Sequence, residues 1–150
     1  MADSDYDIRT LNSLIATTLD SVEGYREAAE DIDNSRFGSM FTARAQERRT
    51  VVSDLQAQVR SLGGNPEDDG TVLAGAHRVF LDLKAKVTGQ DDKAVINEVE
   101  RGEDHIKAKF EDALADSDLS PATLAVIRQA SQSVRQGHDQ MSALKHSMEG

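Results

Sequence analysis

The feature that most constrains this chain is a series of long segments in which apolar residues recur every three or four positions. This spacing places apolar side chains along one face of an α-helix. It predicts helices over residues 5–32, 36–62, 91–115 and 121–147, and a shorter helix over 71–88. No stretch shows the alternation of apolar and polar residues that is typical of a strand. The pattern therefore predicts an all-α fold.

Turn-forming residues separate these helices and indicate their topology. The run from Asp33 to Ser35 is so short that the first two helices must form an antiparallel hairpin. Gly63 and Gly64 end the second helix, and Ser120 followed by Pro121 begins the last one. We expect a four-helix bundle with a short extra helix in the crossover, so that the second and third long helices run parallel. A five-helix up-and-down bundle is the alternative.

Composition limits the partners and the chemistry. A chain of 150 residues can bury an ordinary core, which predicts one domain over residues 1–150. The 27 acidic against 17 basic residues argue against nucleic acid and anionic membranes as partners. The absence of cysteine excludes disulfides and thiolate metal sites. Without an apolar run of membrane-spanning length or a targeting segment, we expect a cytoplasmic protein.

Some polar residues interrupt the apolar faces of the predicted helices. They are Thr18, Arg48, Glu103, Ser131 and His138. Arg135 flanks the last face, about one turn before His138. Because a charge inside a bundle is costly unless it is paired, we predict a core polar network of Arg48, Glu103, Arg135 and His138, with Thr18 beside it. The acidic residues around His105, including Glu100 and Asp104, are expected on the solvated surface.

Short motifs in the chain resemble ferritin-like proteins. Residues 25–30 and 41–48 are similar to the first hairpin of rubrerythrin-type proteins, and residues 99–104 through 110–113 are similar to the second. More narrowly, residues 5–147 resemble a bacterial ferritin-like family of unknown function. The resemblance implies a ferritin-like bundle with one long crossover, and it suggests a stress-related role.

The same resemblance makes it possible to examine the chain for a di-metal centre. The ligand positions of active ferritin-like proteins fall, in chain order, on Thr18, Arg48, Val51, Glu103, Arg135 and His138. Only Glu103 and His138 are of a ligating type. Two guanidinium groups would repel a metal and supply no lone pairs. We therefore expect that the di-metal site has been lost and that the protein has no cofactor.

These observations favour a non-enzymatic protein that acts through protein–protein contacts, by self-association or with another protein. One alternative is an iron- or manganese-binding ferritin-like protein or oxidoreductase that uses Glu103 and His138 together with Glu47. A second alternative is a carrier that holds a small apolar ligand between its helices.

Overall fold

The computed structural model describes residues 2–68 and 92–149, and these residues form four α-helices and no strand. In chain order the helices are α1 (Ala2–Asp31), α2 (Ser35–Ser61), α5 (Asp92–Leu114) and α6 (Pro121–Glu149). The predicted all-α four-helix bundle is confirmed. The short helix expected over residues 71–88, and the five-helix arrangement that depends on it, lie outside the described residues.

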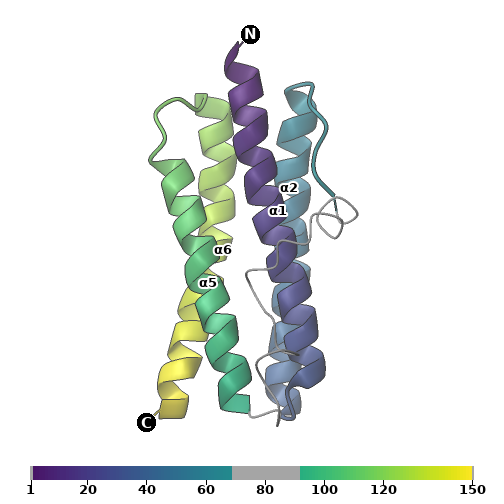
Figure 1. Cartoon of the computed structure of the whole chain (residues 1–150), viewed down its shortest axis with the longest axis vertical. Coiled ribbons are helices and arrows are strands. Elements are labelled where there is room, and N and C mark those ends of the chain that lie inside the picture. The colour runs from purple at the N-terminus through teal and green to yellow at the C-terminus, as the bar shows by residue number, and fades with distance from the viewer. Residues whose placement is uncertain (1, 69–91, 150) are drawn as a thin grey trace.

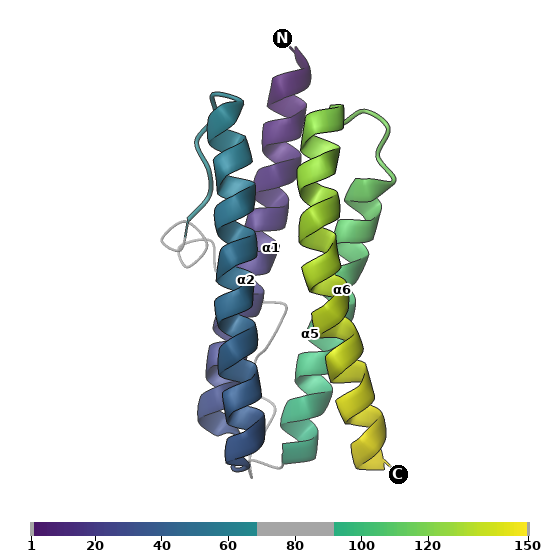
Figure 2. The same ribbon diagram turned by 180° about the vertical axis from the view of Figure 1, so that it is seen from behind.

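The helices form two antiparallel hairpins, α1 with α2 and α5 with α6 (Figure 1). Across the bundle, α1 also packs against α5, and α2 packs against α6. Figure 2 shows from behind that α2 and α5 run in the same direction, with the end of α2 and the start of α5 at opposite ends of the bundle. The parallel orientation predicted for these two helices is therefore correct.

Local signals set the helix ends. The side chain of Asn34 caps α2 by accepting a hydrogen bond from the backbone N–H of Arg36 at 2.9 Å. Gly63 follows α2 with a φ of 85°, a left-handed conformation that favours glycine. Ser120 caps α6 by accepting the backbone N–H of Thr123 at 3.3 Å. These three signals are readable in the sequence, and each lies where a helix begins or ends.

Two aspartates tie the hairpins together at opposite ends of the bundle. Asp7 of α1 is buried and accepts hydrogen bonds from the hydroxyls of Ser120 at 2.6 Å and Thr123 at 2.8 Å, at the start of α6. Asp92, at the start of α5, accepts the backbone N–H of Asp33 at 2.9 Å. Both carboxylates lie at helix N-termini, where the helix dipole favours negative charge.

The core consists of two apolar clusters stacked along the bundle axis. One contains Leu14, Leu55, Ile106, Phe110 and Val134 among others. The other contains Tyr25, Phe41, Val99 and Met141 among others. Each helix contributes to both clusters, and the boundary between them lies near the middle of every helix. Arg48 and Glu103, which have no exposed surface, lie at that boundary. None of the described helices has the length and apolarity needed to cross a membrane.

Candidate functional site

A layer of polar residues separates the two apolar clusters, and its centre is an ion pair. Arg48 of α2 lies one turn from Ala45 of one cluster and from Val52 of the other. Its Nη2 donates to Oε2 of Glu103 on α5 at 2.7 Å, and neither side chain has any exposed surface. The pair therefore joins the two parallel helices across the middle of the bundle.

The remaining polar atoms of the pair are mostly satisfied by α1. The hydroxyl of Tyr25 donates to the second oxygen of Glu103 at 2.8 Å, and Nη1 of Arg48 donates to Ser21 at 3.3 Å. The guanidinium carbon of Arg48 also lies 5.7 Å from the centre of the Tyr25 ring, within range of a cation–π contact. Only Nε of Arg48 lacks a partner. Both oxygens of Glu103 thus already accept a hydrogen bond.

The protonation states follow from burial and from the neighbouring charges. Burial, followed by the charge of Glu103, raises the pKa of Tyr25 well above its ordinary value, so that the hydroxyl stays protonated and donates. Burial alone would lower the pKa of Arg48, but the Glu103 carboxylate outweighs it and the pKa is raised. The layer therefore holds one cation, one anion and a neutral phenol.

Gly137 is the α6 member of this layer, and it makes room for Arg48. A Cβ atom at this position would lie 2.3 Å from Nη2 of Arg48 and 3.2 Å from Oε2 of Glu103. The contact with Arg48 could not form without movement and the one with Glu103 would be tight, so a side chain here would displace the buried guanidinium. Sequence reasoning missed this residue. The available signal was its spacing, three residues after Val134 and four before Met141, both of which are buried.

Two members of the predicted network lie elsewhere, so that part of the prediction is wrong. Arg135 is exposed on α6. His138 is half-buried, and its Nε2 lies 2.6 Å from Asp104 rather than beside Glu103. Each of these residues follows an inward-facing one, Val134 or Gly137, and one residue turns a helix by about 100°. At this level of α6, the two buried positions that have the three-residue spacing are therefore Val134 and Gly137, rather than Arg135 and His138.

Thr18 and Glu47, two further residues named from the sequence, make other contacts than those predicted. Thr18 is buried, but its hydroxyl donates to the carbonyl of Leu14 at 2.7 Å, within α1. It touches the layer only through its own carbonyl oxygen, which accepts the Ser21 hydroxyl at 2.7 Å. Glu47 is 38% exposed and accepts from Arg44 at 2.5 Å and from Ser133 at 2.6 Å. It thus links α2 to α6 at the edge of the core.

The residues of the polar layer do not fit a di-metal centre. Such a centre needs several carboxylates to offset the charge of its cations. The layer offers one, Glu103, and a guanidinium and a phenol occupy both of its oxygens. The alternative ligand set of Glu103, His138 and Glu47 is not assembled either, because these side chains engage different partners.

A different set of ligating side chains does converge, outside the core. Glu100 and Asp104 of α5 and His138 of α6 place one ligand atom each within 4.8 Å of one another. Within the described ranges this is the only group of three such side chains. The expectation that Glu100 and Asp104 are solvated holds for Asp104, which is 57% exposed, but the side chain of Glu100 is only 13% exposed.

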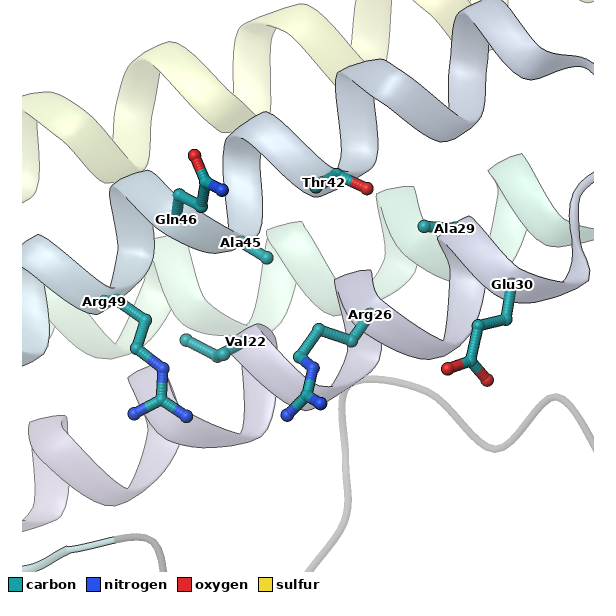
Figure 3. Close-up of a pocket in the computed structure, with 8 residues that line it drawn as sticks. All are labelled: Val22, Arg26, Ala29, Glu30, Thr42, Ala45, Gln46 and Arg49. Atoms are coloured by element: carbon teal, nitrogen blue, oxygen red, sulfur yellow. The ribbon is translucent and has the colours of Figure 1, made fainter.

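The α1–α2 hairpin carries a hollow of about 700 Å³. Small and apolar side chains of Val22, Ala29 and Ala45 lie between the two helices (Figure 3). The charged side chains of Arg26, Arg49 and Glu30 extend along its border. The predicted carrier would hold a small apolar ligand between its helices; this hollow lies between α1 and α2, and the carrier stays a prediction.

Comparison with solved structures shows the fold class. The archaeal Dps homologue from Halobacterium salinarum is similar in structure, with a TM-score of 0.81 and 14% sequence identity. The match covers 96% of this chain and 81% of that protein. A mutant of Dps1 from Mycobacterium smegmatis gives a TM-score of 0.82 at 10% identity, covering 96% of this chain and 97% of that one. The bundle is therefore ferritin-like, as expected.

A third similar structure is described as a dodecameric thioferritin, the bacterioferritin-related protein from Bacteroides fragilis. It gives a TM-score of 0.66 at 16% sequence identity, and the match covers 96% of this chain and 90% of that chain.

Among proteins with curated descriptions, none matches. The family model described as Domain of unknown function (DUF2383) matches residues 7–116, which is more than half of the chain, and the chain therefore belongs to that family.

Proposed function

We propose that this protein is a non-enzymatic ferritin-like bundle that acts through protein–protein contacts, first of all with copies of itself, and that an ion pair has replaced its di-metal site. The observation that carries the proposal is the contact between Arg48 and Glu103, which lies at the centre of the bundle with both side chains fully buried. We retain a cytoplasmic location and a stress-related role as parts of the proposal, on the basis of the acidic composition and of the distant likeness to rubrerythrin-type proteins.

The electrostatics of the layer support the loss of the di-metal site. A cation bound to Glu103 would lie next to the guanidinium of Arg48, where both side chains are buried and solvent screens the repulsion only weakly. It would also have to displace the hydrogen bond from Tyr25. Arg48 thus supplies the positive charge that Glu103 requires, and as a side chain of the protein it is permanently present.

Metal content tests this part of the proposal. Protein from cells supplemented with iron and manganese is analysed for both elements, as wild type and as Glu103→Gln. The proposal expects Glu103→Gln to leave the metal content unchanged, because Glu103 binds no metal. Two iron or manganese ions per chain that disappear in Glu103→Gln would support the oxidoreductase alternative and overturn the proposal. His146→Gln serves as the control, because this histidine is exposed on α6 and lies outside the layer.

The hollow between α1 and α2 supports self-association. Small side chains at its centre allow a helix of another copy to approach closely, and basic Arg26 and acidic Glu30 lie near each other on its border. In a two-fold symmetric dimer the same patch meets itself, and an axis between the two groups would bring the basic group of one copy to the acidic group of its partner. The dodecameric state named for the Bacteroides fragilis protein is consistent with this expectation.

Light scattering with two matched variants tests the contact surface. Gln46 is exposed within the hollow, and Gln136 is exposed on α6, away from it. Gln46→Arg adds a third basic group to the hollow and is expected to weaken self-association by about tenfold, which corresponds to about 1.4 kcal/mol. Gln136→Arg is expected to change nothing. A wild-type protein that remains a monomer at high concentration would contradict self-association.

A further inference from the structure

The three converging side chains of α5 and α6 share the geometry of a cation site. Glu100 and Asp104 are four residues apart, so their carboxylates project from the same face of α5. His138 reaches them from α6, and its Nε2 lies 2.6 Å from Asp104. Side chains from two helices thus supply one nitrogen and two oxygens within 4.8 Å.

The second nitrogen of His138 orients its ring. Nδ1 of His138 lies 3.2 Å from the carboxylate of Asp139. When Nδ1 carries the proton and donates it to Asp139, Nε2 presents a lone pair toward Asp104. Two acceptors then face each other at hydrogen-bond distance, and either a metal ion between them or a proton on Nε2 makes this contact favourable. In metalloproteins a carboxylate commonly holds the far nitrogen of a ligating histidine in this way.

We propose that Glu100, Asp104 and His138 bind one divalent transition-metal ion of the Zn²⁺ type on the seam between α5 and α6. One imidazole and two carboxylates are ligands that such ions accept, and three protein ligands leave positions for water. The burial pattern fits this arrangement. Glu100 and His138 are 13% and 17% exposed, whereas Asp104 is 57% exposed and leaves the site open to solvent.

One basic side chain competes with the proposed ion. Nζ of Lys145 on α6 lies 3.4 Å from Oε1 of Glu100. A bound cation would repel Lys145, whose long side chain is 34% exposed and can turn toward solvent. Lys107, the other nearby base, is already paired with Glu111 at 3.0 Å. Removal of Lys145 should therefore strengthen metal binding, whereas a surface that binds no metal would be indifferent to the change.

This site is separate from the polar layer. Asp104 and His138 each follow the inward-facing residue of their helix, Glu103 or Gly137, and point to the outside of the bundle. The inference does not rest on the proposed function, because it uses none of the residues of the layer. A protein without a di-metal centre can hold this ion, and so can a protein that has one.

Titration with Co²⁺, followed by its visible absorption and by competition with Zn²⁺, tests the site on the full chain. The proposal expects one ion per chain for the wild type. His138→Gln and Asp104→Asn should each weaken binding by at least about tenfold, and Lys145→Met should tighten it. Circular dichroism of each variant checks that the helices persist.

Two control variants distinguish this site from general attraction of cations. His146→Gln removes an exposed histidine from the same helix, and Asp112→Asn removes an exposed surface carboxylate from α5. Both are expected to bind Co²⁺ as the wild type does. Glu103→Gln should also leave this binding unchanged, which separates it from the metal test of the proposed function. The inference is overturned if wild-type protein binds no stoichiometric Co²⁺ at millimolar concentrations, or if the control variants lose binding as His138→Gln does.

Discussion

Two pairs of neighbouring residues on α5 and α6 show how one step along a helix separates two kinds of site. Glu103 and Gly137 face the centre of the bundle, whereas Asp104 and His138 lie on the outer seam. Inside, the carboxylate meets a cation that belongs to the chain, Arg48. Outside, two carboxylates meet an imidazole, and the lysine beside them, Lys145, is 34% exposed and can turn toward solvent. From this comparison we expect an interior that excludes metals and a seam that can bind one.

The largest effect should come from removal of the inner cation. Arg48→Leu leaves Glu103 buried without its counterion, and we expect the free energy of unfolding to fall by about 3–5 kcal/mol. Urea denaturation measures this loss. Arg49→Leu, which changes the adjacent exposed arginine, is the matched control and should shift stability by about 0.5 kcal/mol or less. An Arg48→Leu protein as stable as the wild type would refute a structural role for the pair.

The space left by Gly137 provides the second prediction. Alanine favours a helix over glycine by about 1 kcal/mol, yet Gly137→Ala should destabilise the protein by about 1–3 kcal/mol, because its Cβ would overlap Arg48. Gly38→Ala on α2 is the control, since its Cβ would meet only ordinary contacts at 3.5 Å and beyond. Thermal denaturation should show a lower Tm than the wild type for Gly137→Ala and a higher Tm for Gly38→Ala. Stabilisation by Gly137→Ala would show that the space beside Arg48 can accommodate a Cβ atom at this position.

The phenol of the layer should have a smaller effect that depends on pH. Tyr25→Phe leaves one oxygen of Glu103 without a donor, which should cost about 1–3 kcal/mol at neutral pH. The pKa of Tyr25 is raised in the folded protein, so above about pH 10 the unfolded chain loses this proton first. The stabilisation by Tyr25 is therefore complete below about pH 10 and decreases above it. Equal pH profiles for the wild type and Tyr25→Phe would count against this assignment.

The smallest effect is expected on the seam. In protein freed of metal by a chelator, burial lowers the pKa of His138, but hydrogen bonds with Asp139 and Asp104 outweigh it and raise the pKa. The charged imidazole then contributes stability below about pH 6.5, and this contribution disappears as the pH rises through the folded pKa. Because Asp104 is more than half exposed, the gain should be about 1 kcal/mol or less. The free energies of unfolding of Asp104→Asn and of the wild type at pH 5 and pH 8 measure this contribution. The two pH values lie on either side of the ordinary histidine pKa of about 6.5.

The fold was predictable because large apolar residues carry a clear helical spacing. In α6 the same reasoning correctly placed Ile127, Val134 and Met141 in the core, but it wrongly counted Ser131 and His138 as inward positions. Its inward positions include Ala130 and Gly137, whose small side chains carry little hydrophobic signal, whereas Ser131 and His138 fall beside them and complete an apparent stripe. The buried pair of Arg48 and Glu103 was predictable, because each charge lies within a strong stripe of its own helix. The need for a glycine opposite Arg48 depends on the distance between helices, which one sequence does not specify.

The central claim is that Arg48 and Glu103 contact each other directly in the middle of the bundle. A double-mutant cycle of Arg48→Leu, Glu103→Leu and the double variant, measured by urea denaturation, tests it most directly. The account predicts that each single variant is strongly destabilised, and that the double variant recovers most of the loss and approaches or exceeds wild-type stability. Additive losses in the double variant would contradict the claim.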